Sequence, residues 1–146
     1  MNPHIFREYD IRGIADTDLN DADVALIGRA LGTWYVRNGA KRVAVGQDVR
    51  LTSPRIASSL TAGLNAAGIN VVRIGMVPTP ALYFAVHQWE MDGGVAVTGS
   101  HNPVEFNGFK MNLGTASVYG AMIQEIRYIA EKGQFASGAG SVSDRD

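Results

Sequence analysis

Short apolar runs alternate with helical patterns along this chain, and that alternation constrains the fold more than any other feature. Apolar residues dominate the runs at 42–46, 71–74 and 94–98, which predict buried strands. Residues 20–37 and 53–68 instead repeat apolar side chains every three or four positions, the spacing of an amphipathic helix. Strands that alternate with helices are typical of a layered α/β domain, with helices packed on a mostly parallel or mixed sheet.

Capping residues predict where these helices begin and end. Asn20 caps the helix that runs to Arg37, and Gly39 stops it. Ser53 caps the next helix, and Pro54 occupies its first turn. The other expected elements are a strand within residues 5–12, a short helix near 82–88 and a last helix over 117–131.

The composition changes after Lys132. Residues 133–141 consist largely of Gly, Ala and Ser, which predicts a flexible interdomain linker or tail over 133–146. Residues 1–132 then form the α/β domain. The chain is 46% hydrophobic and contains no internal repeat, which is enough apolar material for one core in a domain of this size.

Charge and cysteine content exclude several classes of function. The 13 basic and 14 acidic residues leave a net charge of −1, so neither nucleic acid nor an anionic membrane is an expected partner. The absence of cysteine excludes a disulfide framework and a thiolate metal site. No apolar N-terminal stretch resembles a signal peptide or a membrane span, and a cytoplasmic location is therefore expected.

A candidate reactive group directly follows the predicted strand at 94–98. The run Thr98–Pro103 (TGSHNP) places the hydroxyl of Ser100 on a turn at the edge of the sheet, where open α/β folds bind their ligands. After a turn signal at Asn107-Gly108, Lys110 returns a cation toward Ser100. A plain surface loop is the alternative, since Gly, Ser, Asn and Pro are ordinary turn formers.

Three separated motifs resemble the α-D-phosphohexomutase family, in particular its bacterial phosphomannomutase/phosphoglucomutase type. They are Phe6–Gly13 (FREYDIRG), Gly46–Arg50 (GQDVR), and Thr98–Pro103 followed by Asn107–Lys110 (NGFK). Their order and spacing agree with the family throughout. The resemblance covers nearly all of this chain but only the first of the family's four domains.

The first motif also bears on the substrate. Phosphoglucosamine mutases usually carry a Thr-Asp-Gly type of sequence where this chain has Glu8-Tyr9-Asp10. The resemblance therefore favours a hexose phosphate over a hexosamine phosphate, with a phosphoglucosamine mutase domain as an alternative. It leaves the choice between mannose and glucose open.

The resemblance implies an enzyme that moves a phosphoryl group between itself and the 1- and 6-hydroxyls of a hexose, by way of a bisphosphorylated sugar. Ser100 would carry the phosphate, and that phosphate would help to bind Mg²⁺. Hexose 1,6-bisphosphate would act as intermediate and activator. The residues expected to take part in catalysis are Ser100, His101, Lys110 and Arg12, and those expected to bind substrate or phosphate are Tyr9, Arg12, Asn102 and Lys110.

The other parts of such an active site lie elsewhere in the family. Its aspartate-rich metal loop, its sugar-recognition loop and its second phosphate-binding loop belong to the other three domains and have no counterpart in this chain. The expected partners are therefore a phosphosugar substrate and the remaining domains of the same enzyme. This chain alone is expected to show no mutase turnover.

The middle motif, Gly46–Arg50, predicts support for the site. Asp48 and Arg50 follow a buried strand, and we expect them to form an ion pair that stiffens the loop after it. The pair is expected to buttress the loop that carries Ser100.

Two further classes of function compete with a mutase. A serine hydrolase would need His101 to reach Ser100, but neighbouring residues on an extended turn point apart, and the chain has no Gly-x-Ser-x-Gly elbow. A non-catalytic module that binds a sugar phosphate through backbone amides stays open as the alternative.

Overall fold

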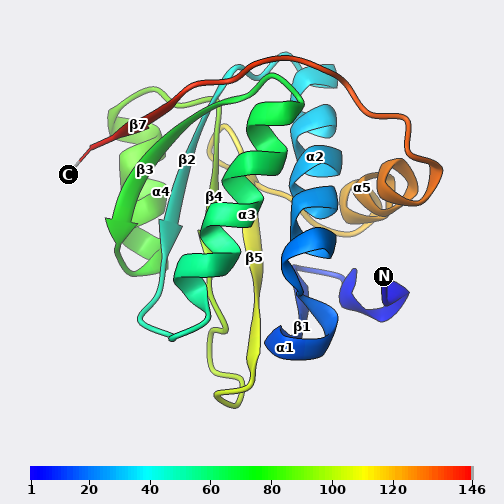
Figure 1. Ribbon diagram of the computed structural model, residues 1–146. Helices are drawn as coiled ribbons and strands as arrows, with labels where there is room; N and C mark the ends of the chain where they lie inside the picture. The colour runs from blue at the N-terminus through cyan, green and yellow to red at the C-terminus, as the bar shows by residue number, and fades with distance from the viewer. Residues whose placement is uncertain (146) are drawn as a thin grey trace.

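The computed structural model describes residues 1–145. Their elements, in chain order, are η1 (Pro3–Ile5), β1 (Ile11–Ile14), α1 (Ala15–Asp18), α2 (Asp21–Arg37), β2 (Arg42–Gln47), α3 (Ser53–Ala66), β3 (Asn70–Met76), α4 (Thr79–Gln88), β4 (Gly93–Val97), β5 (Phe106–Leu113), β6 (Ala116–Ser117), α5 (Ala121–Lys132) and β7 (Val142–Asp144). Among these residues the strands form one mixed seven-stranded sheet with helices on both faces (Figure 1). The predicted layered α/β domain is confirmed.

The sheet has the order β1-β5-β4-β2-β3-β7, and β6 pairs with β5. Strands β4, β2, β3 and β7 are parallel to one another, whereas β5 is antiparallel to both β4 and β1. Both faces of the central parallel strands are covered, which explains why their sequences are continuous apolar runs. Because β2 and β4 are parallel neighbours, the loops that follow them lie at the same edge of the sheet.

The larger hydrophobic core lies between the sheet and the helices α2, α3 and α5. Apolar side chains at the predicted helical spacing are buried there, among them Ile27 and Leu31 of α2 and Leu60 and Leu64 of α3. A smaller core on the opposite face forms around α4, which lies behind the sheet in Figure 1. None of the helices within residues 1–145 is both long enough and apolar enough to cross a membrane.

Helices α2 and α3 approach each other closely because both carry a glycine at their contact. A Cβ atom added to Gly63 would overlap the carbonyl oxygen of Ala25 and would lie 2.9 Å from the carbonyl carbon of Gly28. A Cβ atom added to Gly28 would lie 3.2 Å from the Cα atom of Gly63. The neighbouring atoms belong to the backbone and cannot rotate away, so the contact requires glycine on both helices.

The turn predicted at Asn107-Gly108 is wrong, because both residues lie inside β5 and pair with β1. The chain instead reverses direction over residues 98–105. Gly108 is needed because a Cβ atom there would overlap the carbonyl oxygen of Ile11 on the neighbouring strand. Lys110 lies on β5, which runs back alongside β4, and it pairs with Ala96. That Lys110 brings its charge to Ser100 stays a prediction.

Of the predicted helix starts, one is confirmed and two differ. Asn20 caps α2 as expected, by accepting a hydrogen bond from the backbone N–H of Asp23. Ser53 does not cap α3: Thr52 stands at the cap, and the hydroxyl of Ser53 donates to Asp48. The last helix starts at Ala121, later than predicted, because residues 116–117 pair with β5 as β6.

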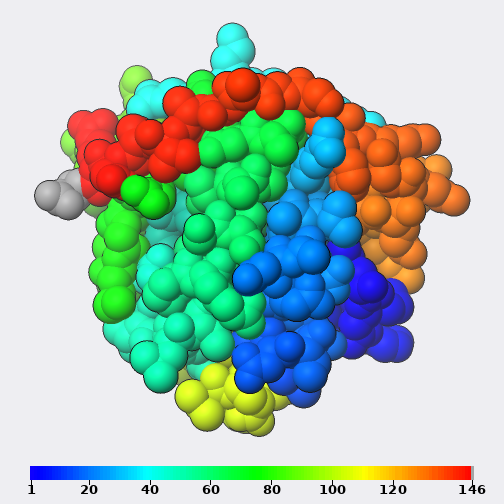
Figure 2. Space-filling view, viewed as in Figure 1, coloured from blue at the N-terminus to red at the C-terminus, as the bar shows by residue number. Residues whose placement is uncertain are grey.

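Residues 133–145 lie against the domain, although their composition predicts a flexible segment. They cross the ends of α2 and α3 and finish as β7, parallel to β3 (Figures 1 and 2). The N–H groups of Gly138 and Gly140 donate to the carbonyls of Ala66 and Asn65, each at 3.0 Å. The glycines that suggested flexibility let the backbone pack closely at this position. That this segment connects to a further domain stays a prediction.

Candidate active site

The serine loop, residues 98–105, joins β4 to β5 and lies at the bottom of Figures 1 and 2. Ser100 is exposed and has a φ of 51°, a left-handed backbone conformation that residues other than glycine rarely adopt. Its N–H donates to Oγ1 of Thr98 at 2.9 Å. Within the described residues the Ser100 hydroxyl has no hydrogen-bond partner. The loop therefore presents a free hydroxyl to solvent from a strained backbone.

Arg12 and Asn102, both predicted to bind phosphate, meet beside the serine loop. Nη1 of Arg12 donates to Oδ1 of Asn102 at 2.9 Å, and Nδ2 of Asn102 donates to the carbonyl of Gly99 at 2.8 Å. Asp10 lies 4.0 Å from Nε of Arg12, and this nitrogen is buried without a hydrogen-bond partner among residues 1–145. A guanidinium with a free donor is thus fixed next to the loop of Ser100.

Tyr9 and Lys110 line a neighbouring cleft of about 310 Å³. Tyr83 of α4 and Tyr119, which precedes α5, complete an aromatic wall around Lys110. Neither of these two tyrosines was found from the sequence, because no local motif marks them and they meet only through the tertiary fold. Burial raises the pKa of the Tyr83 phenol, which therefore stays protonated at neutral pH and can donate a hydrogen bond.

His101, the remaining predicted site residue, is exposed at the tip of the serine loop. Its side chain joins neither the hydrogen bonds around Arg12 nor the lining of the tyrosine cleft in the part of the chain that the structure describes. The predicted residues therefore fall into three positions: Ser100 with Arg12 and Asn102, Tyr9 with Lys110 in the cleft, and His101 on the loop surface.

Asp48, in the loop after β2, holds the base of the serine loop. Its Oδ2 accepts a hydrogen bond from the N–H of Gly99 at 3.0 Å, and its Oδ1 accepts from the hydroxyl of Ser53 at 2.6 Å. The predicted ion pair is confirmed, with Nε of Arg50 at 3.4 Å from Oδ2. Burial alone would raise the pKa of Asp48, but hydrogen bonds from Ser53, Gly99 and Arg50 outweigh it and lower the pKa.

The lowered pKa of Asp48 predicts a loss of stability in acid. The ionised carboxylate stabilises the fold fully above its ordinary pKa of 3.8, and this contribution is lost as the pH falls through the lowered value. Asp48→Asn should lower the free energy of unfolding at neutral pH by about 1–2 kcal/mol. It should also flatten the decline below about pH 4, as measured by urea unfolding at a series of pH values.

Asp16→Asn serves as the control for this comparison, because the Asp16 side chain is 87% exposed. It should keep the pH dependence of the unaltered protein. An Asp48→Asn protein whose stability falls in acid as steeply as that of the control would contradict the assigned role of Asp48.

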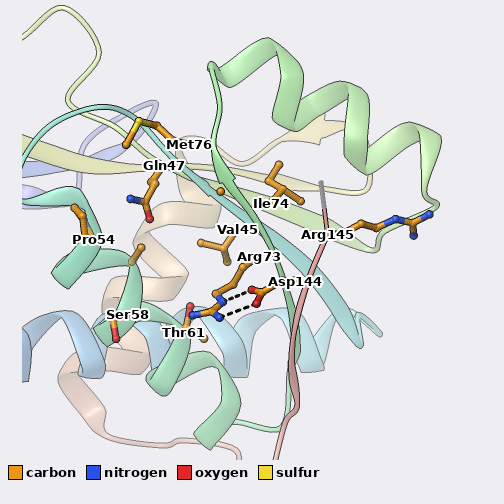
Figure 3. A pocket seen from close by; sticks show the side chains of 12 residues that line it. Val45, Gln47, Pro54, Ser58, Thr61, Arg73, Ile74, Met76, Asp144 and Arg145 are labelled. Atoms are coloured by element: carbon orange, nitrogen blue, oxygen red, sulfur yellow. Dashed lines mark hydrogen bonds and ion pairs between the residues drawn. The ribbon is translucent and has the colours of Figure 1, made fainter.

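A larger cleft, of about 360 Å³, lies between α3 and β7 (Figure 3). Arg73 of β3 and Asp144 of β7, which are paired on these neighbouring strands, line it and form an ion pair of 2.7 Å. This cleft contains no residue of the three motifs except Gln47. Asp144 neutralises its Arg73, and its other cation, Arg145, stacks over Trp89. We place the candidate site at the serine loop, where an exposed hydroxyl, a strained backbone and a free guanidinium donor coincide.

The described residues do not by themselves fit a magnesium site. Mg²⁺ prefers about six oxygen ligands in octahedral geometry, usually including carboxylates. Residues 1–145 contain no group of three or more His, Asp or Glu side chains placed to hold a metal ion. Ser100 is the one predicted ligand on this chain, through a phosphate that it would carry.

The fold and the serine loop define an α/β/α domain that carries an exposed serine at the sheet edge. Residues 3–137 match the family model described as phosphoglucomutase/phosphomannomutase, alpha/beta/alpha domain I. The chain belongs to the phosphoglucomutase/phosphomannomutase family. The resemblance drawn from the three sequence motifs is therefore confirmed.

Relatives in this family are substantially longer than the chain. It is 44% identical over 144 residues to the phosphoglucomutase of Neisseria meningitidis and 44% identical over 142 residues to the phosphomannomutase/phosphoglucomutase of Pseudomonas aeruginosa. Each match covers 97% of this chain and 31% of the relative. A phosphoglucomutase/phosphomannomutase family protein from Burkholderia thailandensis shares the fold with a TM-score of 0.95 at 40% identity, over 100% of this chain and 34% of that chain.

Proposed function

We propose that this chain is the phosphate-carrying first domain of a hexose phosphomutase. Ser100 takes a phosphoryl group from a bisphosphorylated hexose and returns it to the 1- or 6-hydroxyl of a hexose monophosphate. The observation that carries this proposal is the free hydroxyl of Ser100 on a strained backbone, with the Arg12 guanidinium fixed beside its loop. Family membership supports the same reaction class.

In each transfer one P–O bond forms and one breaks. When the hexose accepts the phosphate, its hydroxyl oxygen attacks phosphorus and the bond between phosphorus and the Ser100 oxygen breaks. The sugar hydroxyl loses its proton, and the Ser100 oxygen gains one to become a hydroxyl again. The phosphoryl oxygens carry the negative charge in this step, so a nearby guanidinium favours it. Arg12 is suited to this role, because its Nη1 is held by Asn102 while its Nη2 makes no hydrogen bond in the described part of the chain.

The other predicted residues have auxiliary roles in this proposal. Lys110, half-buried among the tyrosines of the cleft, supplies a movable cation for the sugar phosphate or for proton transfer. Tyr9 contacts the substrate from the rim of the same cleft. His101 is placed next to Ser100 to exchange a proton with the sugar hydroxyl. Mg²⁺ would bind through the phosphate of Ser100, with its other ligands coming from outside this chain.

A domain exchange tests the proposal. We define the exchange enzyme as the Neisseria meningitidis phosphoglucomutase in which this chain replaces the matching residues, over which the two are 44% identical. It should convert glucose 1-phosphate to glucose 6-phosphate at a rate within about tenfold of the parent, because shared positions in a common fold usually preserve site geometry. This chain alone should convert none. A folded exchange enzyme without turnover would contradict the proposal.

A module that only binds a sugar phosphate is the second candidate. It is favoured by one observation, that no base contacts the Ser100 hydroxyl within residues 1–145, whereas an unphosphorylated serine needs one to become a nucleophile. Calorimetric binding of glucose 1-phosphate without any phosphate on Ser100, together with an inactive exchange enzyme, would support this second function.

A further inference from the structure

We propose that Arg50 is the positioning residue of the serine loop: it holds Ser100 in its left-handed conformation and does not itself contact the transferred phosphate. The inference rests on the proposed function of Ser100. It gives Arg50 of the Gly46–Arg50 motif a role beyond its ion pair with Asp48, namely to hold the backbone of the serine loop.

The guanidinium of Arg50 lies inside the serine loop. Its Nη1 and Nη2 donate to four backbone carbonyls at 2.7–3.1 Å. Three belong to Ser100, Asn102 and Pro103 of the loop, and the fourth belongs to Phe106 at the start of β5. Its Nε faces the Asp48 carboxylate at 3.4 Å. The four hydrogen bonds of Nη1 and Nη2 therefore all go to backbone carbonyls, and Nε faces a carboxylate. Arg50 thus directs its donors at the protein, in contrast to Arg12, whose Nη2 makes no hydrogen bond within residues 1–145.

The loop could not keep this shape without a cation at its centre. Four carbonyl dipoles point at one region, and their partial negative charges repel each other unless a positive group lies between them. One of the four carbonyls belongs to Ser100, whose φ of 51° is unfavourable for a residue with a Cβ atom. Hydrogen bonds from a guanidinium are strong enough to offset that cost.

Gly99 lies very close to the guanidinium of Arg50. A Cβ atom at Gly99 would overlap Nε and Cζ of the Arg50 guanidinium. Gly99 does not have a positive φ, so its glycine is explained by this approach and not by backbone conformation. The N–H of Gly99 also donates to Asp48, which joins the loop and the arginine to the same carboxylate.

The topology brings these groups together. Asp48 and Arg50 follow β2, and the serine loop follows β4, its parallel neighbour in the sheet. The backbone N–H of Asp48 donates to the carbonyl of Val97 at 2.9 Å, so the loop after β2 is joined to the end of β4, where the serine loop begins. A residue two positions beyond Asp48 then reaches the centre of the serine loop.

Amide hydrogen exchange on the full chain tests the positioning role. In the Arg50→Lys protein the charge is kept but the planar fork is lost, so the amides of Asn102 and Phe106 should exchange about tenfold faster. Arg55→Lys is the matched control, because Arg55 also donates to backbone carbonyls, those of Ala15 and Leu19, and to none of the serine loop. The N–H of Ala15 donates to Glu105 of that loop, but neither of the two measured amides takes part in this bond. It should leave the exchange of both amides within about twofold.

Phosphoryl transfer in the exchange enzyme supplies a second readout. Arg50→Lys should lower kcat at least about tenfold and leave KM within about threefold, because a misplaced nucleophile slows the chemical step and the substrate contacts remain. Gly99→Ala should have the same two effects, since it displaces the guanidinium without removing it. Gly99→Ala therefore tests the positioning role of Arg50 even if the Arg50→Lys protein does not fold.

Each outcome decides one of the two proposals. Faster loop exchange with a lowered kcat supports the positioning role, whereas loop exchange equal to that of Arg55→Lys, or faster exchange with an unchanged kcat, overturns it. If the unaltered exchange enzyme transfers no phosphate while Arg50→Lys and Gly99→Ala still loosen the loop, Arg50 holds the loop and the proposed function of Ser100 is wrong.

Discussion

Replacing Ser100 with alanine is expected to lower the mutase turnover of the exchange enzyme at least about a thousandfold, since removing a nucleophile that forms a covalent intermediate has effects of this size or larger. The expected loss comes from chemistry alone. Ser100 is exposed, its hydroxyl has no hydrogen-bond partner within residues 1–145, and alanine has the same difficulty with a φ of 51° as serine. Thermal unfolding and turnover should be measured on the same preparation.

Ser58→Ala is the control for this substitution, because Ser58 is exposed on α3, outside the serine loop. It should keep turnover within about twofold and stability within about 0.5 kcal/mol. Substantial turnover by the Ser100→Ala enzyme would show that another group carries the phosphate.

Replacing Gly63 with alanine is expected to destabilise the domain by about 2–3 kcal/mol, because overpacking forces the backbone to shift. Helix propensity predicts the opposite sign, a gain of about 0.5–1 kcal/mol for alanine over glycine in a helix. We expect the contact between α2 and α3 to outweigh helix propensity, since the new Cβ would overlap the carbonyl oxygen of Ala25 and crowd Gly28 of α2. Those are backbone atoms, and α2 would have to move away from α3.

Urea unfolding monitored by circular dichroism measures this change. Ala62→Gly is the matched control, because Ala62 neighbours Gly63 in α3 but is exposed. It should cost about 1 kcal/mol through propensity alone. If Gly63→Ala instead raises the free energy of unfolding, then α2 and α3 do not pack as closely as described.

Local sequence signals predicted the parts of the fold that depend on neighbours along the chain. The cap at Asn20, the buried strands after it and the apolar spacing of α2 and α3 all follow from short-range patterns. The Asn107-Gly108 prediction was wrong because the same dipeptide serves turns and close strand pairing, and only the position of β1 distinguishes the two. The packing of residues 133–145 on the domain could not be predicted for a similar reason, since their glycines contact residues distant in sequence.

The candidate site likewise contains residues that local motifs predict and residues that only the tertiary fold brings together. Ser100, Arg12 and Asn102 lie in recognisable motifs, and the structure places Arg12 and Asn102 in contact. Tyr83 and Tyr119 come from α4 and from the segment before α5, so only the folded chain brings them to Lys110. The acceptors of Arg50 are backbone carbonyls, which every residue possesses, and the side-chain sequence therefore contains no sign of them.

Peptide mass mapping of Ser100 tests the central claim most directly. The exchange enzyme and its Ser100→Ala variant are incubated with glucose 1,6-bisphosphate and Mg²⁺, digested, and compared with untreated protein. We expect phosphate on the peptide that contains Ser100, its loss after excess hexose monophosphate is added, and no phosphate on the variant. A Ser100 peptide that stays unmodified while the enzyme turns over, or phosphate that persists in the Ser100→Ala variant, would contradict the phosphate-carrying role.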